Sequence, residues 1–126
     1  MLLRIRPKAL PAENEDFLLR RIPVSPSYIK PDGSITSFAF SLRKGEDGIS
    51  TDLERLSNPG ISALDRTRFR LARINAGFIR NEINDGLDCI HNPLPENYVH
   101  SLITSQTGKI SDSKSRAMAR NAIVVY

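Results

Sequence analysis

Cysteine and tryptophan are nearly missing from this chain of 126 residues, which has one cysteine, Cys89, and no tryptophan. A single cysteine excludes an internal disulfide framework, and it excludes zinc modules that are built on several cysteines. Such sparse cysteine is typical of a reducing, intracellular environment. Aromatic residues make up only 6% of the chain, which disfavours recognition of single-stranded nucleic acid by a stacking surface.

Long apolar segments are also missing. The first 16 residues, MLLRIRPKALPAENED, contain no apolar run long enough for a signal peptide or a membrane span. We therefore expect a cytoplasmic protein without a membrane partner. The same residues hold two prolines and show no sustained periodicity. We predict a flexible N-terminal arm at 1–16 and, from the remaining length, a single domain at 17–126.

Arginine, in contrast, is abundant. The chain has a formal net charge of +4 and 13 arginines against 5 lysines, and five of the arginines fall within residues 61–80. The planar guanidinium donates paired hydrogen bonds to carboxylates and phosphates, so the pattern indicates an anionic partner, either an acidic protein surface or a nucleic-acid backbone. In the alternative interpretation the arginines pair with acidic residues of the chain itself, four of which fall within residues 81–96. The candidate anion-binding residues are Arg20, Arg21, Arg66, Arg68, Arg70 and Arg73.

Hydrophobic periodicity predicts a small α+β domain. We expect a mixed or antiparallel sheet of about four to six short strands with two or three helices. Helical spacing and N-cap residues indicate helices at 75–84 and 112–121, the second capped by Ser111 or Asp112. Alternation of apolar and polar residues indicates strands at 35–43, 69–74, 87–91, 99–103 and 123–126.

Two segments fit more than one structure. Thr51 and Glu54 have the spacing of a capping box, which predicts a short helix at 52–56, but a strand through 49–51 fits as well. Residues 61–74 carry apolar positions that suit a helix face and, towards their end, an alternation that suits a strand. For this second segment we favour the strand at 69–74.

The most distinctive stretch is GLDCIHNPLPENYVHSLIT at 86–104, which holds both histidines. Pro93 and Pro95 each remove a backbone donor and fix φ, so residues 92–97 cannot continue a strand or a helix. The sequence therefore predicts a strand, a stiff loop and a second strand, with His91 at one rim of the loop and His100 at the other. This pair of histidines makes the loop a candidate site.

His100, with His91 as a second candidate, could act as a general acid or base, because imidazole ordinarily titrates near neutral pH. Arginines would then stabilise charge on a phosphoryl group. The structural alternative is that His100 hydrogen-bonds Asn97 or the backbone and holds the loop. No metal-ligand spacing and no cofactor motif is present in the sequence, and we expect neither a metal nor a cofactor.

Four short motifs resemble a loose group of small bacterial proteins: FLLRRIP at 17–23, DGIS at 47–50, AGFIR at 76–80 and NPLPENYVH at 92–100. The resemblance spans residues 17–126 and implies a stand-alone domain, with no activity attached to it. From the residues themselves we favour a small basic interaction module that contacts an anionic partner through its arginines. The alternative is a small His-dependent enzyme that acts on a phosphate-containing substrate, such as a nucleotide or RNA.

Overall fold

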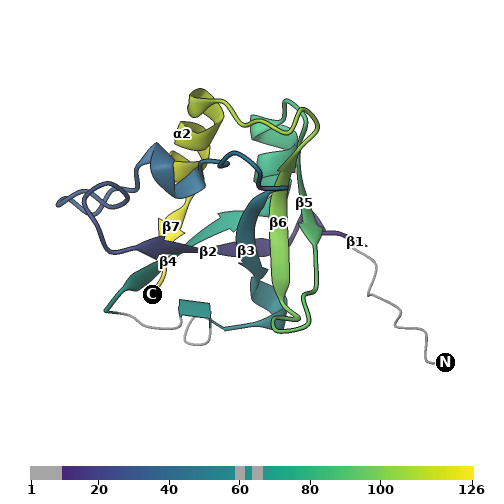
Figure 1. The fold of residues 1–126 in the computed structure, drawn as a ribbon, viewed down its shortest axis with the longest axis horizontal. Coiled ribbons are helices and arrows are strands. Elements are labelled where there is room, and N and C mark those ends of the chain that lie inside the picture. Colours follow the sequence, from purple (N-terminus) through teal and green to yellow (C-terminus); the bar gives the residue numbers. More distant parts are fainter. Residues whose placement is uncertain (1–9, 59–61, 64–66) are drawn as a thin grey trace.

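The computed structural model describes residues 10–58, 62–63 and 67–126. Seven strands form one sheet in the order β1-β5-β6-β3-β2-β4-β7, and all neighbouring strands are antiparallel (Figure 1). The strands are β1 (Leu10–Pro11), β2 (Phe17–Pro23), β3 (Ile49–Leu53), β4 (Phe69–Asn75), β5 (Leu87–His91), β6 (His100–Ser105) and β7 (Ile123–Val124). Of the two expected kinds of sheet, mixed or antiparallel, the structure has the antiparallel one, and the small domain consists mostly of this sheet.

The sheet has more strands than the four to six expected, for two reasons. β1 has only two residues, which are too few to leave a periodic pattern. β2 has the sequence FLLRRIP, in which apolar residues are adjacent to one another and are followed by two arginines. Period-2 alternation, the usual signal of a half-buried strand, is therefore missing from both.

The helical segments are η1 (Ser37–Phe40), η2 (Glu54–Leu56), η3 (Phe78–Ile83) and α2 (Asp112–Asn121). Two of them, η3 and α2, overlap the predicted helices, and α2 begins at the predicted cap Ser111. Ala76 and Gly77 are helical residues between the predicted cap Asn75 and η3. The Asn75 side chain accepts from the Phe78 N–H, and the Ser111 hydroxyl accepts from the Lys114 N–H. None of the described helices is long and apolar enough to cross a membrane.

The hydrophobic core lies between the sheet and the helical segments η1, η3 and α2. α2 packs against η1, and both lie on the same side of β2 and β4 (Figure 1). In the segment 75–84, where a helix was predicted, Ala76, Ile79 and Ile83 are all buried. The largest fully buried side chains are Phe40, Leu18, Leu19, Ile22, Ile49, Leu53, Leu71, Ile74, Ile79, Ile103 and Met118.

The strand predicted at 35–43 is wrong, because Ser37–Phe40 forms the 3₁₀ helix η1. The alternation of Phe38 and Phe40 with small residues predicted one shared face. Instead Phe40 is fully buried, whereas 64% of Phe38 is exposed. The Ala39 carbonyl oxygen accepts its hydrogen bond from a side chain and not from a neighbouring strand: the Arg20 Nε–H donates to it at 2.8 Å.

The two ambiguous segments are resolved in favour of strands. Ile49–Leu53 is β3, and the helix predicted at 52–56 is reduced to the single turn η2, which begins at Glu54. Phe69–Asn75 is β4, as favoured from its alternation. Part of the second segment, including Arg66, lies outside the described residues.

Residues 10–16 are the described part of the predicted N-terminal arm, and residues 1–9 lie outside the described residues. Leu10 and Pro11 pair with β5, and Asp16 is buried, where its carboxylate accepts from the Arg55 Nε–H at 2.8 Å. The AGFIR motif approaches this segment closely. A Cβ atom on Gly77 would lie 2.7 Å from the Asn14 carbonyl oxygen, so this contact between segments requires glycine.

Candidate functional site

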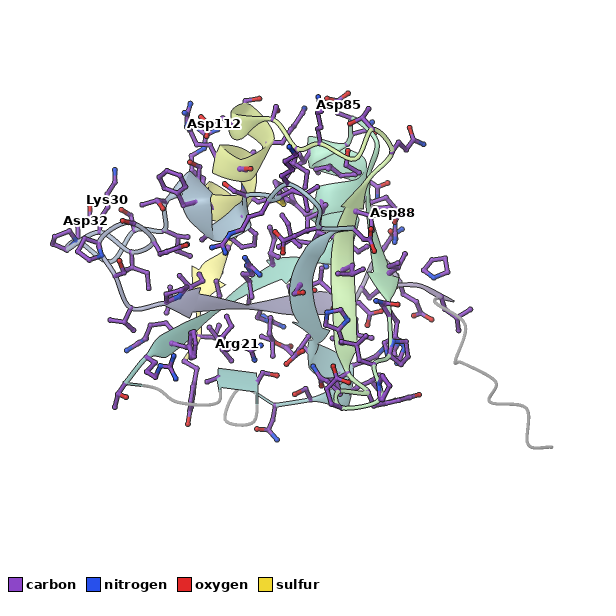
Figure 2. The ribbon with its side chains drawn as sticks, in the orientation of Figure 1. Arg21, Lys30, Asp32, Asp85, Asp88 and Asp112 are labelled. Carbon is purple, nitrogen blue, oxygen red and sulfur yellow. The ribbon has the colours of Figure 1, made fainter. Side chains whose placement is uncertain are left out.

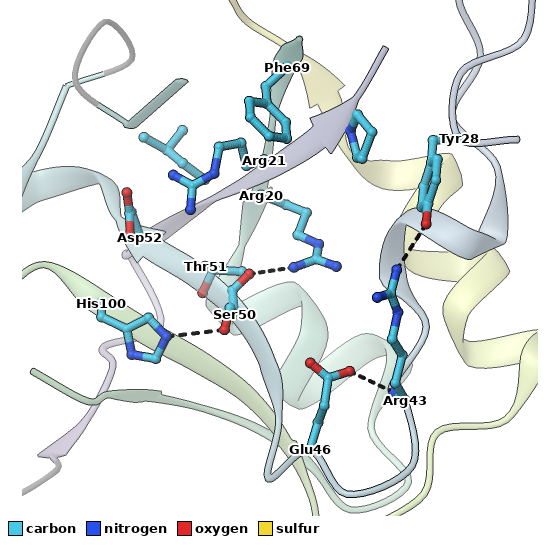
Figure 3. A pocket seen from close by; sticks show the side chains of 12 residues that line it. Arg20, Arg21, Tyr28, Arg43, Glu46, Ser50, Thr51, Asp52, Phe69 and His100 are labelled. Carbon is cyan, nitrogen blue, oxygen red and sulfur yellow. Dashed lines mark hydrogen bonds between the residues drawn. The ribbon is translucent and has the colours of Figure 1, made fainter. Parts of the chain in front are cut away.

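A pocket of about 230 Å³ opens on one face of the sheet, over β2 and β3 (Figure 3). Its charged and titratable lining consists of Arg20, Arg21, Arg43, Glu46, Asp52 and His100. Two of the sequence-predicted anion-binding residues and one predicted catalytic residue therefore meet in one concavity. Tyr28 and Phe69 add aromatic surface to its wall.

Strand register brings His100 into this pocket. β3 and β6 are antiparallel neighbours in which Asp52 lies opposite His100 and Ser50 lies opposite Leu102. Ser50 and His100 are therefore diagonal neighbours on the same face, at a separation within reach of side chains. Thr51 belongs to the other face, where its hydroxyl and the buried Ser101 hydroxyl lie 2.6 Å apart.

His100 is held by hydrogen bonds at both ring nitrogens. Only 9% of the residue is exposed. Its Nδ1 lies 2.9 Å from the Asn92 carbonyl oxygen, and its Nε2 lies 3.2 Å from the Ser50 hydroxyl oxygen. The predicted contact with the loop backbone is thus present, and the second nitrogen faces a side chain that the sequence had not singled out.

The double-proline loop fixes the position of His100. Leu94 and Asn97 exchange backbone hydrogen bonds of 3.0 and 3.1 Å, with Pro95 as the second residue of the turn. The Asn97 side chain donates to Asp52 at 2.9 Å, and its carbonyl accepts from the His100 N–H at 3.2 Å. The loop is therefore tied to both the strand that carries His100 and the strand opposite.

We expect Pro95→Gly to lower the free energy of unfolding by about 0.4–1 kcal/mol, because glycine increases the entropy of the unfolded chain. Amide hydrogen exchange measured by NMR should become faster at residues 92–98. The control is Pro31→Gly, in an exposed turn, which should change exchange near residue 31 alone. Unchanged protection of residues 92–98 in Pro95→Gly would show that the proline does not brace the loop.

Arg20 forms the floor of the pocket and is anchored by neutral acceptors. Its Nε–H donates to the Ala39 carbonyl at 2.8 Å. Its Nη1 donates to the Ser50 carbonyl, also at 2.8 Å (Figure 3). Burial lowers the pKa of Arg20 from its ordinary value. The carboxylate of Glu46 opposes this shift, whereas the positive charges of Arg43 and Arg21 add to it. The positive charges of Arg43 and Arg21 therefore repel that of Arg20.

The other two arginines of the pocket are also held by neutral groups. The Arg21 Nη1 donates to the Ser62 carbonyl at 2.7 Å, and its guanidinium carbon lies 5.9 Å from the centre of the Phe69 ring. The Arg43 Nη2 donates to the Tyr28 hydroxyl at 3.0 Å. Within the described residues, none of the three pocket arginines has a carboxylate within salt-bridge distance.

Two carboxylates of the acidic segment 81–96 form ion pairs away from the pocket. Asp88 pairs with Arg80 at 2.8 Å and Asp85 with Lys114 at 3.9 Å. Figure 2 shows Asp85 at the opposite end of the molecule from Arg21. Neither Asp85 nor Asp88 therefore neutralises an arginine of the pocket.

The other predicted anion-binding residues that the structure describes lie outside the pocket. Arg73 pairs with Glu54 at 2.8 Å, and Arg70 lines a separate, more apolar hollow. Arg68 is exposed, with its guanidinium carbon 5.4 Å from the centre of the Phe69 ring.

His91 is also apart from the pocket. Its Nε2 contacts the Tyr98 carbonyl oxygen at 2.7 Å, and the two rings meet edge to face. Burial raises the pKa of the Cys89 thiol to about 12, so this cysteine is a poor nucleophile at neutral pH. Among the described residues no group of three or more His, Cys, Asp or Glu side chains is placed to hold a metal ion.

Comparisons with family models, curated proteins and solved structures find no match for this chain. The residues of the site that were not predicted from the sequence include Ser50, Arg43 and Tyr28. Ser50 belongs to the DGIS motif, and the strand alternative at 49–51 would have placed it on the face opposite Ile49. The contact between Ser50 and His100 depends on the pairing of β3 with β6. The local sequence around either residue does not indicate this pairing.

Proposed function

We propose that the pocket binds a phosphate-bearing ligand, either a nucleotide or one phosphate of a nucleic-acid backbone. The observation that carries this proposal is the convergence of Arg20, Arg21 and Arg43 on one concavity, each anchored by a neutral acceptor. A carbonyl or a phenol is a neutral acceptor, so it orients a guanidinium without neutralising its positive charge, as a carboxylate partner would. Planar N–H groups of fixed orientation suit the oxygens of a phosphate.

The balance of charge supports the same ligand class. Three cationic side chains face two carboxylates in the pocket, Glu46 and Asp52. Both carboxylates accept hydrogen bonds of 2.9 Å from neutral donors, the Arg43 backbone N–H and the Asn97 amide respectively. An anion between the guanidinium groups would relieve their mutual repulsion, which is the general basis of electrostatic complementarity in binding sites.

The shape of the pocket favours a single phosphate group over an acidic protein surface. A volume of about 230 Å³ is small compared with the pockets of drug-sized ligands, which are about 300–1,000 Å³, and it accommodates a phosphate with part of the group that bears it. Protein partners, in contrast, engage flat areas of roughly 800 Å² on each side. The Phe69 ring at the wall offers a surface for the remainder of the ligand.

The test is a titration followed by NMR of the ¹⁵N-labelled protein, with inorganic phosphate and with a short RNA as separate probes. We expect chemical-shift changes at residues 20–21, 43 and 50–52. RNA binding should weaken with salt, with a slope of log K against log[salt] of about −0.7 for each phosphate engaged. Arg21→Gln should weaken the binding of both probes by about 10- to 150-fold, because a hydrogen bond to a charged group contributes about 1.5–3 kcal/mol.

The matched control is Arg116→Gln, which removes an equal charge from the exposed surface of α2, where Arg116 pairs with Asp112. Equal weakening by Arg21→Gln and Arg116→Gln would indicate attraction by net charge alone and would contradict a pocket site. Absence of binding of both probes at low salt would also contradict the proposal. Binding of an acidic peptide, with neither phosphate nor RNA bound, would favour a protein partner instead.

A further inference from the structure

Ser50 occupies a position that the phosphate proposal alone does not use. It is exposed on β3, and it contacts two residues of the pocket (Figure 3). Its hydroxyl lies 3.2 Å from His100 Nε2, and its carbonyl accepts from Arg20 at 2.8 Å. A hydroxyl, an imidazole and a guanidinium are thus connected in one chain of contacts.

The direction of the hydrogen bonds follows from their chemistry. A carbonyl oxygen only accepts, so the Asn92 contact requires a proton on His100 Nδ1. In a neutral imidazole the other nitrogen is then an acceptor, and the Ser50 hydroxyl donates to His100 Nε2. This is the arrangement of an activated nucleophile: a hydroxyl bonded to a base whose tautomer is fixed by a third group.

His100 reaches the pocket through Ser50. Both ring nitrogens are engaged, and 9% of the residue is exposed, so a water molecule or a substrate hydroxyl would have to displace Ser50 before it could use His100 as a base. The neighbouring hydroxyl of Thr51 is excluded, because it bonds Ser101 on the buried face. Ser50 is therefore the hydroxyl that His100 can activate towards the pocket.

We propose that Ser50 is the nucleophile, and His100 the general base, of a phosphoester hydrolysis in the pocket. The inference rests on the proposed binding of a phosphate-bearing ligand. Arg20 acts as the cation that stabilises charge on the phosphoryl oxygens, since its guanidinium is bonded to the backbone of the attacking residue. His91 takes no part.

The first step forms a phosphoserine. The Ser50 hydroxyl proton passes to His100 Nε2, Oγ forms a bond to phosphorus, and the bond from phosphorus to the ester oxygen breaks. In an in-line displacement the leaving oxygen departs on the side opposite Oγ with the electron pair of that bond. The leaving oxygen is therefore on the side away from His100. If the leaving group is a strong base, such as an alkoxide, it takes a proton from solvent.

The second step restores the enzyme. A water molecule attacks phosphorus and loses a proton to solvent, while the bond from phosphorus to Oγ breaks. His100 returns its proton to the Ser50 oxygen. The sum of the two steps is one phosphoester and one water converted into one alcohol and one phosphate, with Ser50 and His100 unchanged.

The experiment combines turnover with covalent trapping. The probes are bis(4-nitrophenyl) phosphate, followed by release of nitrophenolate, and diisopropyl fluorophosphate, which phosphorylates an activated serine with loss of fluoride. We expect nitrophenolate release by the parent protein and a phosphoryl adduct mapped to Ser50 by peptide mass spectrometry. Ser50→Ala should abolish both signals, and His100→Gln should lower both rates by about 10²–10⁴-fold, as for removal of a general base.

Two controls separate chemistry from folding and from binding. Ser113→Ala removes an exposed serine of α2 and should leave both rates unchanged. Ser50→Ala should retain the melting temperature of the parent and its NMR response to inorganic phosphate, because the binding arginines are intact. His100→Gln is assessed from its rates at a temperature well below its own melting midpoint.

Each outcome decides between the two proposals. If the parent protein binds phosphate but shows no turnover and no adduct at Ser50, the proposal that Ser50 is a nucleophile is refuted, while the proposed phosphate-binding site is supported. Turnover that persists in Ser50→Ala would also refute the proposal that Ser50 is the nucleophile. An adduct at Ser50 in a protein that binds no phosphate would support the Ser50–His100 pair and refute the proposed ligand class.

Discussion

Phe40→Ala is expected to lower the free energy of unfolding by about 3–5 kcal/mol, the usual range for removing a buried aromatic ring from a core. Phe40 is fully buried among residues of the sheet and α2. Its loss removes the contact that fixes η1 over the sheet, and the cavity cannot be filled by its neighbours without moving the helical turn.

Phe38→Ala provides a matched control in the same turn. Because 64% of Phe38 is exposed, its replacement should change stability by about 0.5 kcal/mol or less. Chemical denaturation of both variants measures the difference directly. Similar effects of the two substitutions would show that 35–43 is a strand with a shared phenylalanine face, as the sequence pattern suggested, and would contradict the 3₁₀ turn.

Arg20→Lys should also destabilise the fold, although it conserves charge. Arg20 reaches two carbonyls from two different nitrogens, and in this way it ties η1 to β3. A lysine has one ammonium group and cannot reproduce the planar fork. Loss of one hydrogen bond to a charged group predicts a decrease of about 1.5–3 kcal/mol in the free energy of unfolding.

Arg116→Lys is the control for this substitution, because Arg116 is 59% exposed on α2 and its replacement should have almost no effect. Thermal and urea unfolding of the two variants give the comparison. If Arg20→Lys unfolds at the same urea concentration as the parent, the guanidinium serves the pocket through its charge alone and has no structural role.

The predictable part of the fold is the part that leaves a local pattern. β4, β5 and β6 were predicted from alternation, and α2 from its cap and spacing. The segment 35–43 alternates equally well but forms η1, because the Arg20 side chain, distant in sequence, satisfies the Ala39 carbonyl. Single-sequence patterns contain no information about such a partner.

The same limit applies to the site. Residue type and a rigid loop were enough to select His100, and an excess of charge was enough to select Arg20 and Arg21. The excess of positive charge in the sequence does not distinguish the pocket residues Arg20 and Arg21 from Arg70 and Arg73, which lie outside the pocket. Ser50 was missed because its significance depends on the register between β3 and β6, which places it diagonally across from His100.

The order of strands in the sheet also has a kinetic consequence. Ser50 and His100 are 50 residues apart in the chain, and β1 pairs with β5 across most of the sequence. Such pairings raise the contact order, and folds dominated by them form in milliseconds to seconds, far more slowly than helical domains. The hairpin of β5 and β6 can form early from local contacts, but His100 meets its serine only when that hairpin docks on β3. During refolding, any signal that reports the Ser50–His100 contact should therefore appear with the slow phase of sheet assembly.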